Sequence, residues 1–193
     1  MIQMSRKLDQ LMKELKKVNA ETFYHCLRTK KLVIDMIDKT NSHGLTDYDS
    51  AMIDIICKGA LMHDIGKLYV DNFILTKETY LTNEEKALVQ EHVNLGYNVV
   101  KNELEHSELE IVSNIIRYHH ERCDGSGYVG KTDLPMYVNI VAICDVFDSL
   151  YSDRIYRDGF SAEKSMELIA NGACGVFDDR LIKFMTEISG KLD

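Results

Sequence analysis

Apolar residues recur along most of this chain every three to four positions, and strict apolar–polar alternation is scarce. The chain has one proline, Pro135, so few positions interrupt a helix for that reason. These patterns predict an all-α fold. The predicted helices span about 5–18, 20–39, 51–63, 82–101, 107–121, 136–151, 162–170 and 179–188.

Polar residues indicate where several helices begin. Thr82 followed by Glu85 is a capping-box pattern that starts the helix at 82–101. We expect irregular structure over 66–81 and a loop over the glycine-rich segment 124–130. The other expected N-caps are Thr46 or Asp47, Ser161 and Asp178.

The first helix carries an apolar stripe made by Leu8, Leu11, Met12 and Leu15. Such a stripe docks on the body of the protein, pairs with a second chain in a homodimer, or belongs to a linker. The rest of the chain has no internal repeat and no long linker. We therefore predict an N-terminal helix or linker at 1–18 and one domain at 19–193.

Composition narrows the classes of partner. The 193 residues are 45% hydrophobic and 28% charged, with a net charge of −8, which argues against broad binding to nucleic acid polymers or anionic membranes. A phosphate-bearing substrate is still compatible with this negative net charge, because bound cations would reverse the sign of the charge near the site. Five cysteines without CxxC spacing favour reduced, buried thiols. With no signal-like start and no apolar window of membrane length, we expect a cytoplasmic protein.

Histidines and carboxylates lie where the helical pattern predicts buried faces. His119 and His120 end two adjacent apolar rows on the helix at 107–121. His43 and His106 lie in predicted turns and are expected at the surface. Other polar residues on predicted apolar faces are Glu21, His25, His63, Asp64, His92, Asp145 and Asp148.

These residues point to metal chemistry only as a group, since a single buried histidine or aspartate usually just forms a hydrogen bond. Several buried, unpaired carboxylates would cost more than the roughly 5–15 kcal/mol that stabilise a domain. A shared metal cluster removes that cost. Histidine and carboxylate ligands favour Fe, Mn or Zn, and their number predicts at least two ions, an arrangement suited to phosphoester hydrolysis.

The sequence around these residues resembles the HD-GYP family, a subgroup of HD-superfamily phosphohydrolases that cleave cyclic di-GMP. The resemblance implies an HD-domain bundle of about seven helices around a buried metal cluster. The family's GYP triplet is Gly127-Tyr128-Val129 here, and loss of the proline should loosen the 124–131 loop. The matching segments are ETFYHCLR (21–28), ALMHDIGKL (60–68), EHVNLG (91–96), IRYHHERCDGSGY (116–128) and VAICDVFDSLYSDRIYR (141–157).

The resemblance implies that Asp64 bridges two metals. Glu21 matches a carboxylate that supports a third metal in some members, and its other interpretation is a carboxylate favoured by the helix dipole. The implied ligands of one site are His25, His63 and Asp145, and those of the other are His92, His119 and His120.

It also implies roles in catalysis and substrate binding. Lys67 would contact the scissile phosphate, unless it is a solvated lysine after a helix end. Asp148 would orient or deprotonate the nucleophilic water, or support a metal-binding histidine. Tyr128 would contact the ligand, and Arg154 and Arg157 would hold substrate phosphate or guanine, or one of them would brace the loop.

The expected activity is hydrolysis of cyclic di-GMP to pGpG and/or GMP by a hydroxide that bridges two or three divalent metals, Fe or Mn before Zn. One alternative is an HD-type phosphohydrolase that acts on another nucleotide or phosphoester. The other is a non-catalytic signalling module that binds a ligand or partner protein.

Overall fold

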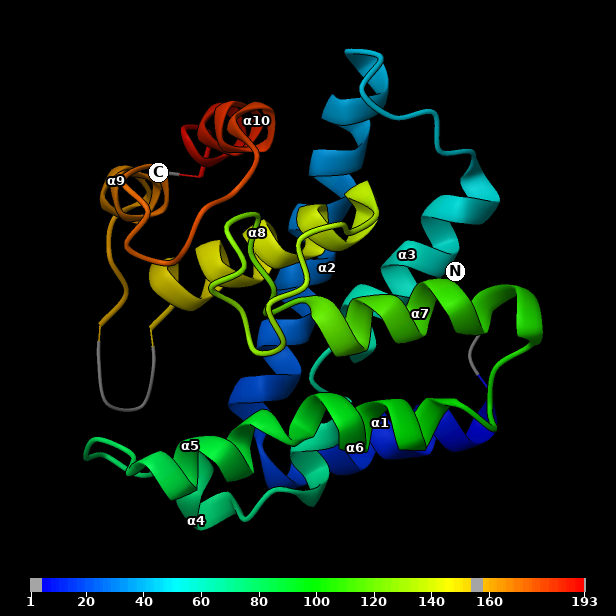
Figure 1. Ribbon diagram of the computed structural model, residues 1–193. Helices are drawn as coiled ribbons and strands as arrows, with labels where there is room; N and C mark the ends of the chain where they lie inside the picture. The colour runs from blue at the N-terminus through cyan, green and yellow to red at the C-terminus, as the bar shows by residue number, and fades with distance from the viewer. Residues whose placement is uncertain (1–4, 154–157, 193) are drawn as a thin grey trace.

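The computed structural model describes residues 5–153 and 158–192, so Arg154 and Arg157 lie outside the described residues. The named elements in these ranges are all helices (Figure 1), which confirms the all-α prediction, although they are more numerous than the family resemblance suggested. They are α1 (Arg6–Val18), α2 (Ala20–Ser42), α3 (Ser50–Met62), the 3₁₀ helix η1 (Ile65–Tyr69), α4 (Asn72–Leu75), α5 (Asn83–Gln90), α6 (His92–Val100), α7 (His106–Tyr118), α8 (Met136–Tyr151), α9 (Ala162–Ala170) and α10 (Asp179–Ser189).

Local sequence signals set several boundaries as predicted. α8 and α9 have the expected bounds. Thr82 and Glu85 form the predicted capping box, in which the Thr82 side chain accepts from the Glu85 amide at 3.2 Å and the Glu85 carboxylate accepts from the Thr82 amide at 2.8 Å. Ser161 and Asp178 cap the last two helices.

The predicted helix at 82–101 is instead two helices that meet at Glu91. The second of them, α6, packs against η1 so closely that the two backbones touch. A Cβ atom on Gly66 would lie 1.9 Å from the His92 carbonyl oxygen and 2.5 Å from the Gly96 amide nitrogen. Only glycine leaves room for this contact.

Three other predicted boundaries also differ. Asp49 caps α3 by accepting from the Met52 amide, whereas the Thr46 hydroxyl bonds to the side chains of Thr40 and Asn41. η1 and the short α4 occupy much of the segment expected to be irregular. α7 ends before the two site histidines that the prediction placed inside it.

The helices pack around two apolar clusters. The larger cluster takes residues from α2, α3, α7, α8, α9 and α10. The smaller one takes residues from α1, α3, η1, α6 and α7. Both α3 and α7 therefore contribute to each cluster, with Ile56 and Ile115 in the larger and Met62 and Ile116 in the smaller. Packing against both apolar clusters therefore holds α3 and α7 in place.

The stripe on α1 is buried by this chain's own body, where α1 packs on α2 and η1. Leu8 and Leu15 are fully buried and Met12 nearly so. None of the helices formed by the described residues is long and apolar enough to span a membrane.

Candidate metal centre

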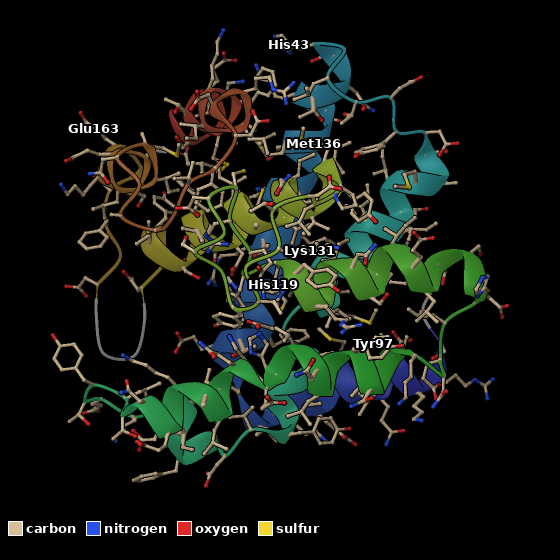
Figure 2. All side chains as sticks on the ribbon, in the orientation of Figure 1. His43, Tyr97, His119, Lys131, Met136 and Glu163 are labelled. Carbon is tan, nitrogen blue, oxygen red and sulfur yellow. The ribbon has the colours of Figure 1, made fainter. Side chains whose placement is uncertain are left out.

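The predicted ligands come from separate helices and meet at one place. His63 and Asp64 directly follow α3, and His119 and His120 directly follow α7. Figure 2 shows His119 in the middle of the molecule and His43 at the tip of α2, far from it. His43 and His106 are exposed, as predicted. Possible ligand atoms form two groups, and within each group these atoms all lie within 4.8 Å of one another. One group is Asp64, His92, His119 and His120, and the other is His25, His63 and Asp145.

Backbone carbonyls orient three of the imidazole rings. The Nδ1 atoms of His63 and His92 each lie 2.7 Å from a carbonyl oxygen one turn earlier, and His119 Nδ1 lies 3.0 Å from the Ile116 oxygen. A carbonyl oxygen only accepts, so each Nδ1 carries the hydrogen. In the neutral form of each ring, which is also the form that binds metal, Nε2 therefore presents a lone pair to the centre of the cluster.

The lone pairs of these rings face other acceptors at short range. His92 Nε2 and His119 Nε2 are 3.4 Å apart. His63 Nε2 and His25 Nε2 are 3.3 Å apart, and His25 Nε2 is 2.9 Å from an Asp145 oxygen. Acceptors that face each other repel unless a cation lies between them. The geometry thus favours cations at the centre of each group.

Asp64 lies between the two groups. Its Oδ1 is 3.3 Å from His92 Nε2, and its Oδ2 is 3.5 Å from His63 Nε2 and accepts from Lys67 Nζ at 2.6 Å. Burial disfavours the charged carboxylate, but Lys67 and His63 outweigh it and hold the pKa of Asp64 well below its ordinary value. Oδ1 is buried without a hydrogen-bond partner. A buried anionic oxygen in that state is suited to bind a metal ion.

Burial also keeps several rings neutral. It lowers the pKa of His120 to about 3 and lowers the pKa values of His92 and His119. Neutral imidazole is the form that binds metal. The pKa of His63 is raised well above its ordinary value, because Asp64 and other neighbours outweigh the effect of burial. The carboxylates that attract a proton there would equally attract a cation.

Asp148 lies behind His25. Its Oδ2 accepts from His25 Nδ1 at 2.7 Å, and its Oδ1 accepts from Arg28 Nε at 2.8 Å and Ser152 Oγ at 3.0 Å. Arg28 and His25 hold the pKa of Asp148 below its ordinary value despite burial. With both oxygens engaged, Asp148 is arranged to orient His25 rather than to bind water.

Lys67 and Glu21 line a cavity of about 200 Å³ beside the cluster, with Leu75 and Leu81 on its wall. On the loop after α7, the Tyr128 ring stacks on His120, with centroids 4.4 Å apart and planes at 26°. The structure thus brings Glu21, Lys67 and Tyr128 to the edge of the site.

Sequence reasoning gave no role in the site to three residues. Cys26, taken only as a small buried side chain, has its sulfur within 4.8 Å of ligand atoms of His63 and Asp64. The helical pattern places Arg28 on one face with Glu21 and His25, but its partner Asp148 lies 120 positions away. Glu121 accepts from loop amides eight and ten positions further along, and no local pattern reveals these contacts.

The donor set fits divalent metal ions. Imidazole nitrogens and carboxylate oxygens converge, burial keeps the rings of His92, His119 and His120 neutral, and a buried carboxylate oxygen lacks a partner. Zinc, iron and manganese all accept such ligands.

Comparison with known proteins agrees with this reading. The chain is 30% identical over 180 residues to a cyclic di-GMP phosphodiesterase of Vibrio cholerae, covering 89% of this chain and 37% of that protein. It is 31% identical over 148 residues to 3'3'-cGAMP-specific phosphodiesterase 2 of the same organism, covering 75% of this chain and 28% of the relative. The chain spans well under half the length of these relatives.

A solved structure shares the fold. Bd1817, an HDG"Y"P protein from Bdellovibrio bacteriovorus, aligns with a TM-score of 0.67 at 20% identity over 86% of this chain and 51% of that chain. The HD domain family profile matches residues 22–150. With these relatives, the match confirms the resemblance inferred from the motifs. The chain belongs to the HD domain family.

Proposed function

We propose that this chain is a metal-dependent phosphodiesterase domain that hydrolyses cyclic di-GMP to linear pGpG and/or GMP. The observation that carries the proposal is the pair of ligand groups that meet at Asp64, with imidazole lone pairs facing each other and a carboxylate oxygen that has no other partner. The name of the Vibrio cholerae relative supports the choice of substrate.

In this proposal the two groups would hold two ions, with iron or manganese preferred, and Asp64, which lies between the groups, would be a ligand shared by both sites. Glu21 would support a third ion at the edge of the cavity. Bound divalent metals would supply Lewis acidity toward phosphate oxygens and make water a stronger nucleophile at neutral pH.

The chain's own side chains would position the phosphate and handle charge. Lys67 Nζ lies beside Asp64 and lines the cavity, so its ammonium can pair with a phosphate oxygen and give a proton to the leaving oxygen. Asp148 would fix the orientation of the His25 ring by accepting the hydrogen on His25 Nδ1. Tyr128 would form one wall of the substrate site. Arg154 and Arg157 stay proposed phosphate or guanine contacts.

A second candidate substrate is 3'3'-cGAMP, because one relative is named for that specificity. The same cluster would hydrolyse either cyclic dinucleotide, since the bond that breaks is the same. Contacts to the bases would decide between them.

The test is turnover of cyclic di-GMP, 3'3'-cGAMP and a simple aryl phosphodiester by protein loaded with Mn²⁺ or Fe²⁺ under reducing conditions. We expect linear product from cyclic di-GMP. His119→Ala should lose metal and all turnover, because it removes a buried ligand. His106→Ala is the matched control, since His106 is exposed at the start of α7, and should behave as the wild type.

Other outcomes select the alternatives. Cleavage of 3'3'-cGAMP but not of cyclic di-GMP would reassign the substrate. Thermal protection by cyclic di-GMP without turnover in fully metallated protein would make the chain a binding module.

A further inference from the structure

Glu121 directly follows the site histidines, but its carboxylate faces the next loop. The side chain is only 1% exposed. Its Oε1 accepts from the Val129 amide at 2.9 Å, and its Oε2 accepts from the Lys131 amide at 2.7 Å. Both oxygens are therefore used by backbone groups of one loop, eight and ten residues further along the chain.

The loop is shaped around this carboxylate. A Cβ atom on Gly127 would lie 2.5 Å from Glu121 Cα and 2.8 Å from Oε2, so only glycine fits at this position. Lys131, labelled in Figure 2, also places its ammonium 5.3 Å from the ring centroid of Tyr118 at the end of α7. The loop is thus fastened to the end of α7, directly before the site histidines.

Tyr128 lies between these fastening points. It sits one residue before the amide that Oε1 binds and one residue after Gly127. Its ring stacks on His120, a member of the Asp64 group. The position of this ring therefore depends on how firmly residues 127–131 are held.

Val129 explains why a hydrogen bond, rather than a proline ring, restrains the loop in this chain. Where the resembling family has proline, the loop gains rigidity from the fixed φ angle, but a proline nitrogen has no hydrogen to donate. Val129 supplies that hydrogen, and the Glu121 carboxylate accepts it.

We propose that Glu121 is a positioning residue that clamps the 124–131 loop through the Val129 and Lys131 amides and so holds Tyr128 against His120 at the edge of the substrate site. The consequence for turnover rests on the proposed function. The clamp itself does not, since it can be measured without substrate.

The first test compares Glu121→Gln with the wild type. The amide replaces one acceptor oxygen by a donor, which leaves one loop N–H without a partner. We expect amide hydrogen exchange over 124–131 to accelerate by about tenfold, on the scale of one charge-assisted hydrogen bond. Metal content should not change. KM for cyclic di-GMP should rise with little change in kcat, and cleavage of the small aryl phosphodiester should stay as in the wild type.

Glu163→Gln is the charge-matched control, because Glu163 is exposed on α9, away from the loop (Figure 2), and should change none of these quantities. Loss of metal from Glu121→Gln with unchanged loop exchange would overturn the inference, since Glu121 would then belong to the metal site.

A second pair of variants leaves the buried residue intact. Lys131→Pro removes the N–H that Oε2 accepts, whereas Lys131→Ala keeps it. Both variants lose the ammonium contact with Tyr118, so the proline variant should raise KM and speed exchange over 124–130 clearly more than the alanine variant. Equal behaviour of the two variants would overturn the clamp. A wild type that hydrolyses no cyclic dinucleotide would remove the proposed function, while the exchange data would still decide the role of Glu121.

Discussion

The hydrogen on each imidazole ring determines what the residues of the cluster can bind. Three rings give their Nδ1 hydrogen to a backbone carbonyl, which leaves Nε2 free to bind an electrophile. The backbone at the ends of α3 and α7 and at the start of α6 thus sets ring orientation. The Nδ1 hydrogen of His25 goes instead to a side chain, that of Asp148.

Lys67 allows a prediction about a single charge. Replacing it by methionine keeps the length of the side chain but removes the ammonium that would stabilise phosphate. We expect kcat to fall by about 10²–10³-fold, the usual effect of removing one donor to developing charge. Metal content should be retained, as measured by elemental analysis.

Lys77→Met provides the control. Lys77 pairs with Glu85 as Lys67 pairs with Asp64, and their side chains are 23% and 22% exposed. If both variants lose activity equally, Lys67 has no special role at the phosphate.

The sequence predicted the members of the cluster better than their connections. His92 and His119 were identifiable because they continue apolar rows on helices, and such rows point inward. The contact of Asp148 with His25 and Arg28 joins residues 120 or more positions apart. No helical period encodes such a pair.

At the scale of helices, boundaries set by local hydrogen bonds were predictable and boundaries set by packing were not. The Thr82–Glu85 capping box acts within four residues, so its sequence was sufficient. The break at Glu91 has no proline or glycine to mark it. It accompanies a backbone contact between α6 and η1, which only the folded chain reveals.

The packing of α1 gives a stability prediction. Leu8 is fully buried in the smaller apolar cluster, so Leu8→Ala should lower the free energy of unfolding by about 2–5 kcal/mol in denaturant titration. Leu192→Ala, at a partly exposed position near the C-terminal end, should cost much less.

For the molecule as a whole, we expect the cluster to couple metal content to stability. Chelation should lower the melting temperature by about 5–10 °C, since a ligand at 100 times its Kd contributes about 2.7 kcal/mol. Adding Mn²⁺ back should restore it, as followed by circular dichroism. Asp64→Asn, which removes the shared charge, should respond little to either treatment.

An identical melting temperature with and without chelator, at proven metal loss, would contradict this coupling. The buried acceptors would then be satisfied by protons alone.

The contact of Gly66 with His92 and Gly96 fixes the spacing of Asp64 and His92, two members of one ligand group. Asp64 lies two residues before Gly66, and His92 itself is one of the touching residues, so no side-chain rotamer sets the gap between their backbones. The contact between these peptide groups holds the two backbones at a constant distance. Adaptation to ions of different radius must therefore come from rotation of imidazole and carboxylate groups. Gly66→Ala would instead push the backbones of η1 and α6 apart.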